Sequence, residues 1–117
     1  MEERAALDWK ICESSPVIRP GQLHPGLDDN RAGAGHVIRL GDRYRMYYWA
    51  GGPRGNAIAM AESPVARPDE WRPVGGALLG AQPDTEHNAN GPSFPFVLPV
   101  DERLWLMFVC CWGRPKP

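Results

Sequence analysis

Two stretches of the chain carry the same order of features 61 positions apart, and this repeat constrains the fold more than any other property. The offset places Tyr44 on Trp105, Met46 on Met107, Tyr48 on Val109 and Gly52 on Gly113. Each copy holds a loop with acidic residues, an apolar segment, a charged turn, an aromatic segment and a glycine. A four-stranded antiparallel unit that recurs at such a spacing is typical of a β-propeller blade.

Short apolar and aromatic runs, bounded by glycine, proline and charged turns, predict six strands. These runs cover residues 36–40, 44–50, 57–62, 71–79, 94–100 and 104–109. The chain has 13 glycines and 13 prolines among 117 residues, which is well above average usage and supplies the turns. Pro73 and the pair Gly75-Gly76 interrupt the fourth run, which suits the edge of a sheet. The sequence therefore predicts an all-β fold built from antiparallel four-stranded blades.

The second copy of the repeat contains only two predicted strands, so the sequence holds about one and a half blades. We divide it into an N-terminal segment and entry loop (1–31), a first β-blade (32–80) and a partial second β-blade (81–117). A propeller closes with roughly four to eight blades. The chain is therefore expected to be a fragment of a longer protein or to assemble with other chains. Two unrelated hairpins in one β-sandwich are the alternative to propeller blades.

Composition and charge argue against several classes of protein. A hydrophobic content of 43% and a net charge of −1 argue against a disordered chain. The near-neutral charge also argues against a nucleic-acid binder that tracks phosphates. No run approaches the roughly 18 apolar residues of a membrane span. The first ten residues lack the apolar core of a signal peptide, so a cytoplasmic location is predicted, with secretion left as an open alternative.

The sequence predicts neither a metal site nor a cofactor. The three cysteines lack the spacing of a zinc site or of a disulfide framework: Cys12, Cys110 and Cys111. The three histidines match no ligand motif either: His24, His36 and His87. The glycine-rich stretch 33–35 is followed by a predicted strand and not by a helix, so it is no phosphate-binding loop.

The string VIRLGDRYRMYYWAGG, followed by AIAMAESP and Trp71, resembles the first blade of five-bladed β-propeller glycoside hydrolases of families 43 and 32. The block NGPSFPFVLPVDERLWLMFVCCWG resembles the start of their next blade, so the resemblance covers about residues 20–113. It implies hydrolysis of O-glycosyl bonds by two carboxylic acids. The Asn-Asp-Pro-Asn run of family 32 is absent, which argues against fructoside hydrolysis.

The resemblance also implies positions for the catalytic and substrate-binding residues. An Asp at the start of the first blade would act as base or nucleophile, and here Asp28 and Asp29 are equal candidates. The usual acid glutamate belongs to a later blade, so the isolated chain is expected to lack the general acid. Side chains that can stack on a sugar or bond its hydroxyls are the candidate substrate-binding residues: Arg45, Trp49, Glu86, His87 and Asn90.

Each of these residues also has a purely structural interpretation. The two aspartates could cap backbone N–H groups in a solvated turn. Glu86 and His87 could belong to an exposed loop, and Trp49 could pack in a core. Two functions therefore stand side by side. One is glycoside hydrolysis, with an oligosaccharide or polysaccharide as partner. The other is a non-catalytic β module that binds carbohydrate or protein, and open sheet edges would favour self-association in either case.

Overall fold

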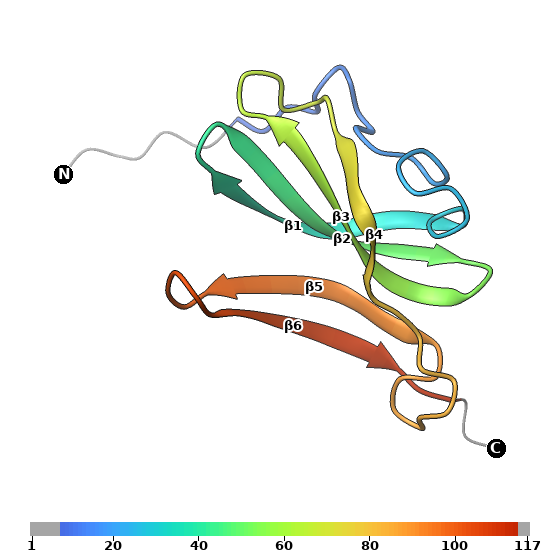
Figure 1. Cartoon of the computed structure of the whole chain (residues 1–117). Coiled ribbons are helices and arrows are strands. Elements are labelled where there is room, and N and C mark those ends of the chain that lie inside the picture. Colours follow the sequence, from blue (N-terminus) through green and yellow to red (C-terminus); the bar gives the residue numbers. More distant parts are fainter. Residues whose placement is uncertain (1–7, 115–117) are drawn as a thin grey trace.

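The computed structural model describes residues 8–114, which form six strands in two antiparallel sheets (Figure 1). The strands are β1 Arg31–Leu40, β2 Arg43–Gly52, β3 Gly55–Pro64, β4 Arg72–Leu79, β5 Gly91–Pro99 and β6 Trp105–Trp112. Strands β1 to β4 pair in chain order in the first sheet, and β5 pairs with β6 in the second. The prediction of an all-β, antiparallel fold is confirmed. Within residues 8–114 no helix is long and apolar enough to span a membrane.

All six predicted strands are present, and most of them extend beyond their predicted bounds. Strand β1 begins at Arg31 instead of at 36, and β6 continues to Trp112 instead of ending at 109. Backbone pairing carries both hairpins to these ends, because Arg31 pairs with Gly51 and Gly91 pairs with Trp112. Glycine weakens a strand through its backbone freedom, but it leaves the ladder hydrogen bonds available. Strand β4 lies at the edge of the first sheet, as its proline predicts.

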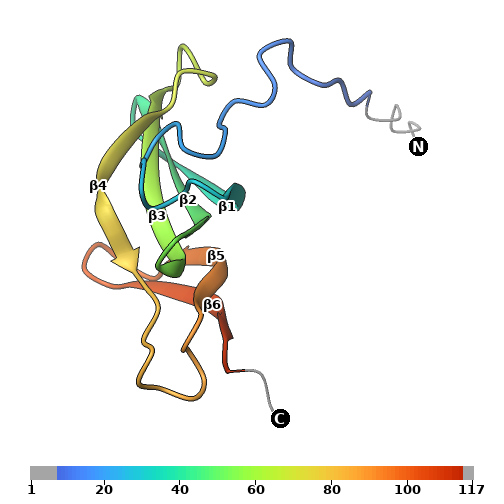
Figure 2. The same ribbon diagram turned by 90° about the vertical axis from the view of Figure 1, so that its right-hand side faces the viewer.

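Hydrophobic side chains pack against both faces of the first sheet. Figure 2 shows the strands of the second sheet lying across the lower end of the first sheet in that view. Side chains alternate between the two faces of a strand. Met46 and Tyr48 of β2 pack against Leu23 of the N-terminal segment, which crosses one face. Tyr47, on the opposite face, packs against Val97 of β5. The second sheet therefore lies on the face of the first sheet that the N-terminal segment leaves free.

His36 of β1 and the strand β5 connect the two sheets. The Nδ1 atom of His36 accepts a 2.9 Å hydrogen bond from the backbone N–H of Val97. The ring of His36 stacks on Phe96, with 4.5 Å between ring centroids and 19° between planes. This histidine thus fixes how the second sheet sits on the first.

The hairpins β1–β2 and β5–β6 are equivalent in strand register. The pairing of β1 with β2 shifts between Gly33 and His36, and that of β5 with β6 shifts between Ser93 and Phe96. An equivalent backbone hydrogen bond of 2.8 Å also closes the open end of each hairpin. It runs from Asn30 N to Gly51 O in the first hairpin and from Asn90 N to Trp112 O in the second. The sequence repeat is therefore a repeat of structure. The offset is 60 between β1 and β5 and 61 between β2 and β6, since the second turn has one more residue.

The two equivalent hairpins also face the same way. Met107 and Val109 of β6 are the counterparts of Met46 and Tyr48, and they pack toward the first sheet beside Tyr47. The face of the second sheet that packs on the first sheet is therefore equivalent to the face of the first sheet that packs on the N-terminal segment. The outer face of the second sheet stays exposed, and its side chains include Phe96, Leu98, Leu106 and Phe108.

Candidate functional site

Asp28 is fully buried, and its carboxylate accepts three hydrogen bonds. The backbone N–H of Gly21 donates to Oδ1 at 3.1 Å, and that of His24 donates to Oδ2 at 3.3 Å. The hydroxyl of Tyr48 donates to Oδ2 at 2.8 Å. The N–H of Gly21 also donates to the Asp28 carbonyl at 3.0 Å, so the entry loop closes into a ring around this side chain. The contacts of Asp28 are those of a residue that holds the loop together.

Tyr48 and His24 extend this cluster across the first sheet. The Nδ1 atom of His24 lies 2.6 Å from the Tyr48 hydroxyl oxygen. Its Nε2 lies 3.2 Å from the carbonyl oxygen of Gly75 in β4, and because a carbonyl only accepts, Nε2 carries the donated proton. Burial raises the pKa of Tyr48, and the neighbouring Asp28 raises it further, so the hydroxyl stays protonated. The cluster ties the entry loop to β2 and β4.

Asp29 differs from its neighbour because its side chain is exposed. Its Oδ1 accepts a 2.7 Å hydrogen bond from the backbone N–H of Gly26. This is the backbone-capping role that short acidic side chains often have in turns. The structure thus separates the two aspartates by environment, and the catalytic role of either one stays a prediction.

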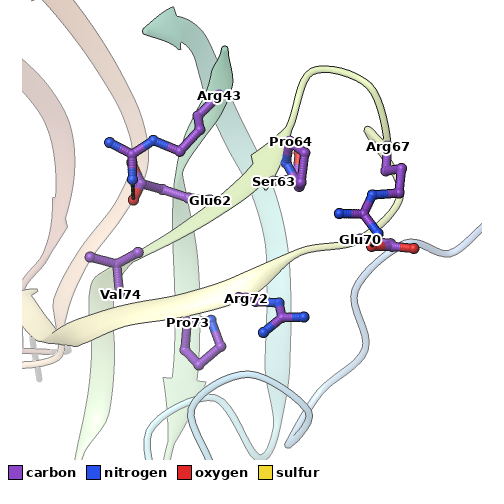
Figure 3. A pocket seen from close by; sticks show the side chains of 9 residues that line it. All are labelled: Arg43, Glu62, Ser63, Pro64, Arg67, Glu70, Arg72, Pro73 and Val74. Atoms are coloured by element: carbon purple, nitrogen blue, oxygen red, sulfur yellow. Dashed lines mark hydrogen bonds and ion pairs between the residues drawn. The ribbon is translucent and has the colours of Figure 1, made fainter. Parts of the chain in front are cut away.

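Arg45 belongs to an ion-pair network and does not join the other predicted site residues. Its Nε lies 3.2 Å from Oε2 of Glu62, and Nη1 of Arg43 lies 3.2 Å from Oε1 of the same carboxylate. A hydrogen bond with Tyr47 is the largest influence that raises the pKa of Arg45, and Glu62 also raises it. Glu62 and Arg43 line a hollow of about 370 Å³ at the ends of β3 and β4 (Figure 3). The guanidinium of Arg45 is therefore already paired with the carboxylate of Glu62 within the same chain.

Trp49 and Asn90 come together in a pocket of about 360 Å³ where the two hairpins meet. The guanidinium carbon of Arg31 lies 4.2 Å from the centroid of the Trp49 ring, within cation–π distance. Trp112 stacks against Trp49, with 6.2 Å between ring centroids and 19° between planes. The other residues that line the pocket are Gly55 and Asn56. We call the pocket formed by Arg31, Trp49, Asn90 and Trp112 the junction pocket.

Hydrogen bonds fix the orientation of both indoles in the junction pocket. The Nε1–H of Trp49 donates to Oδ1 of Asn56 at 2.8 Å. The Nε1–H of Trp112 donates to Oγ of Ser93 at 2.6 Å. Trp49 is 9% exposed and Trp112 is 46% exposed, so Trp112 offers most of the accessible aromatic surface. The junction pocket is therefore a rigid aromatic surface beside an exposed guanidinium.

The close approach of the start of β3 to the turn before β5 builds the junction pocket. The backbone N–H of Asn56, the second residue of β3, donates to the carbonyl oxygen of Asn90 at 2.8 Å. Gly91 follows with a φ of +92°, and a Cβ there would collide with the carbonyl of Asn56. Only glycine accommodates both this backbone conformation and this contact without strain. The side-chain amide of Asn90 donates to Gly113 O at 3.0 Å, which leaves its own carbonyl oxygen as an acceptor.

Glu86 and His87 lie in the exposed loop between β4 and β5, apart from the junction pocket. The backbone carbonyl of Glu86 accepts a 3.2 Å hydrogen bond from the N–H of Arg114. His87 lines a different hollow, of about 450 Å³, together with Asn88 and Cys111. The structure thus brings together two of the seven predicted site residues, Trp49 and Asn90.

Arg31 and Trp112 complete the junction pocket, and sequence reasoning did not assign them to one site. Arg31 reads as a solvated residue at the end of a polar run. Trp112 is one of several aromatic residues that could stack on a sugar ring or pack in a core, and its residue type alone does not place it beside Trp49. The repeat contained the missing signal, because it brings the end of β6 to the same relative place as the end of β2. Recognising the pocket also requires the pairing of Arg31 with Gly51, two positions from Trp49.

Among residues 8–114 no cluster of three or more His, Cys, Asp or Glu side chains is arranged to hold a metal ion. No family model, curated protein or solved structure matches the chain. The functional argument for this protein therefore depends on the geometry of its own residues.

Proposed function

We propose that this protein binds carbohydrate in the junction pocket. The observation that carries the proposal is the stack of Arg31, Trp49 and Trp112 beside the exposed amide of Asn90. The C–H face of a sugar ring packs on an aromatic surface, while guanidinium and amide groups bond its hydroxyls. A mostly apolar pocket with a few convergent polar groups is the usual form of a small-molecule site.

The charge and size of the junction pocket support this ligand class. Within the described part of the chain no carboxylate forms an ion pair with Arg31, so its guanidinium is available to a ligand. A volume of about 360 Å³ is near the lower end of small-molecule sites, which suits a few sugar units better than a large ligand. The fixed indoles also reduce the entropy that would be lost on binding.

The second candidate function is that of a β-propeller glycoside hydrolase. The like-oriented stacking of the two sheets favours it, since successive blades stack in one direction around a propeller. If a two-fold axis related the two repeats in a β-sandwich, the equivalent faces of the two sheets would instead pack against each other. Asp29 supplies one exposed carboxylate at the entry to the first repeat. The reaction requires a second carboxylic acid beside the first. Hydrolysis would therefore be a further step on a bound carbohydrate, and it is compatible with the binding function proposed above.

The binding proposal is tested by titrating the protein with neutral and acidic oligosaccharides in a calorimeter, after a glycan array has selected ligands. We expect Trp112→Ala and Arg31→Ala each to weaken binding at least tenfold. Trp105→Ala and Arg39→Ala are matched controls outside the pocket, and they should leave the affinity unchanged. The proposal is wrong if the array gives no ligand, or if the pocket variants bind as well as the controls.

A further inference from the structure

The geometry points to a second binding surface, the free edge of β6. We propose that this edge accepts an antiparallel β-strand from a partner polypeptide, with small apolar side chains at alternate positions. Strand addition of this kind derives affinity from backbone hydrogen bonds and specificity from alternate side chains.

The first sheet shows what occupies the equivalent edge. Strand β2, the counterpart of β6, pairs with β3 along its whole length, from Arg43 with Pro64 to Gly52 with Gly55. Strand β6 pairs with β5 on one side, and within residues 8–114 no strand pairs with its other side. Because the two hairpins share their register shift and their closing hydrogen bond, the same strand position is defined beside β6.

The composition of β6 leaves this edge open to pairing. Charged side chains and proline protect the edges of natural sheets from pairing. The sequence of β6, WLMFVCCW, contains neither. The other edge strands are protected. Strand β4 contains Pro73 and a register shift, and Gly75 within it has a φ of +61°. Strand β1 carries Arg31 and Arg39 and has its own shift. Strand β5 contains three prolines and a register shift of its own. Of the four edge strands in the described chain, β6 alone lacks these features.

Exposure of the outer face of β6 supports the same conclusion. Phe108 is 57% exposed, whereas its counterpart Tyr47 in β2 is 6% exposed. Leu106, on the same face of β6, is also substantially exposed, at 40%. An added strand would extend this two-stranded sheet and would shield part of this apolar surface from water.

The packing between the sheets specifies the side chains of the partner strand. In β3 the small residues Ala57, Ala59 and Ala61 lie on the same face of the first sheet as Met46 and Tyr48. The equivalent face of the second sheet points inward, toward the first sheet. A strand added to β6 therefore needs small residues on its inward face and can carry larger apolar residues outward. A second copy of β6 does not meet this requirement, because its inward residues include Met107 and Val109.

A labelled peptide with the β3 sequence, GNAIAMAESP, is the probe for this edge. We expect saturable binding to the full chain, measured by fluorescence anisotropy. A control peptide with N-methyl groups at alternate residues cannot form one row of backbone bonds and should bind at least tenfold more weakly. Equal binding of the two peptides, or no binding of the β3 peptide, would overturn the proposal.

Variants of the chain provide a second arm of the test. Phe108→Lys introduces a charge on β6 at an exposed position and should weaken peptide binding at least tenfold. Val37→Lys makes the same kind of change on the exposed edge strand β1 and should have no effect. A dimer in sedimentation equilibrium that Phe108→Lys dissociates would show that a second copy occupies the edge, which would also contradict the proposal. Should Phe108→Lys fail to fold, the two peptides still decide the question on the unaltered chain.

Discussion

The hydroxyl of Tyr48 donates a 2.8 Å hydrogen bond to Oδ2 of Asp28, and both side chains are fully buried. Tyr48 comes from β2, whereas Asp28 comes from the loop that enters β1. A buried carboxylate is tolerated when its oxygens are hydrogen-bonded, and this one has three donors. The bond therefore joins two segments of the chain that the strand ladder does not connect.

The first prediction concerns the unequal roles of Asp28 and Asp29 in stability. Asp28→Ala removes the carboxylate that accepts from the backbone N–H of His24 and from the buried hydroxyl of Tyr48, and we expect it to lower the free energy of unfolding by about 3 kcal/mol or more. Asp29→Ala removes one exposed hydrogen bond to Gly26 and should cost about 1 kcal/mol. Urea denaturation followed by circular dichroism measures both values. Equal losses for the two variants would contradict the assignment of Asp28 as the structural residue.

The second prediction is a loss of stability at alkaline pH that depends on Tyr48. Its pKa is raised in the folded protein, first by burial and then by Asp28, above the ordinary value of 10.0. Below pH 10 both states hold this proton. Above pH 10 the unfolded state loses it first, so the free energy of unfolding should fall by up to about 1.4 kcal/mol per pH unit.

Tyr48→Phe should abolish that part of the alkaline fall, while Tyr44→Phe, a matched change in the same strand, should retain it. Urea denaturation from pH 8 to pH 11 compares the three proteins. If the alkaline slopes of the original protein and Tyr48→Phe coincide, the raised pKa makes no contribution to stability.

The third prediction tests the contact that builds the junction pocket. A Cβ at Gly91 collides with the backbone carbonyl of Asn56, and the φ of +92° is unfavourable for alanine. Gly91→Ala should therefore lower the free energy of unfolding by about 2 kcal/mol or more and weaken sugar binding. Gly76→Ala is the control, since nothing lies within 4 Å of its added Cβ and its φ is not positive. A Gly91→Ala protein as stable as the control would argue against the close approach of Gly91 to the start of β3.

The fourth prediction separates binding from hydrolysis. Glycoside hydrolysis uses two carboxylic acids that flank the scissile bond, and Asp28 is buried under three donors. We therefore expect this chain alone to release no aryl group from aryl glycosides above the uncatalysed rate. Turnover that disappears in Asp29→Asn but persists in Glu86→Gln would show that the chain is itself a catalyst.

Much of the fold could be predicted because its signals are local. Short apolar and aromatic runs, together with the glycine and proline turns, predicted all six strands, and Pro73 predicted the edge position of β4. The repeat predicted that the segments around Tyr44 and Trp105 are equivalent, and the shared register shifts confirm it. The start of β1 lies outside its predicted bounds because glycine and alanine carry weak strand propensity while the ladder continues through them. The end of β6 lies outside its bounds because its last residues pair with the first residues of β5, which the sequence alone does not show.

The site could be predicted only in part. Of the predicted substrate-binding residues, Trp49 and Asn90 line one pocket, whereas Arg45, Glu86 and His87 lie elsewhere, and the binding role of each residue stays a prediction. Residue type alone does not show that a partner such as Glu62 already engages an arginine. That information depends on which residue stands opposite in the neighbouring strand, and Arg45 pairs with Glu62.

The sequence by itself determined the strand segments, the turns between them and the existence of two equivalent hairpins, since these depend on periodicity within a few residues. Only the tertiary structure decided that Asp28 is buried while Asp29 is exposed, and that Arg31 lies over Trp49. Contacts of this kind depend on strand register, and a shift of one residue exchanges every side chain between the two faces of a sheet. The bulge at Gly33 and His36 and the added residue in the second turn set that register here.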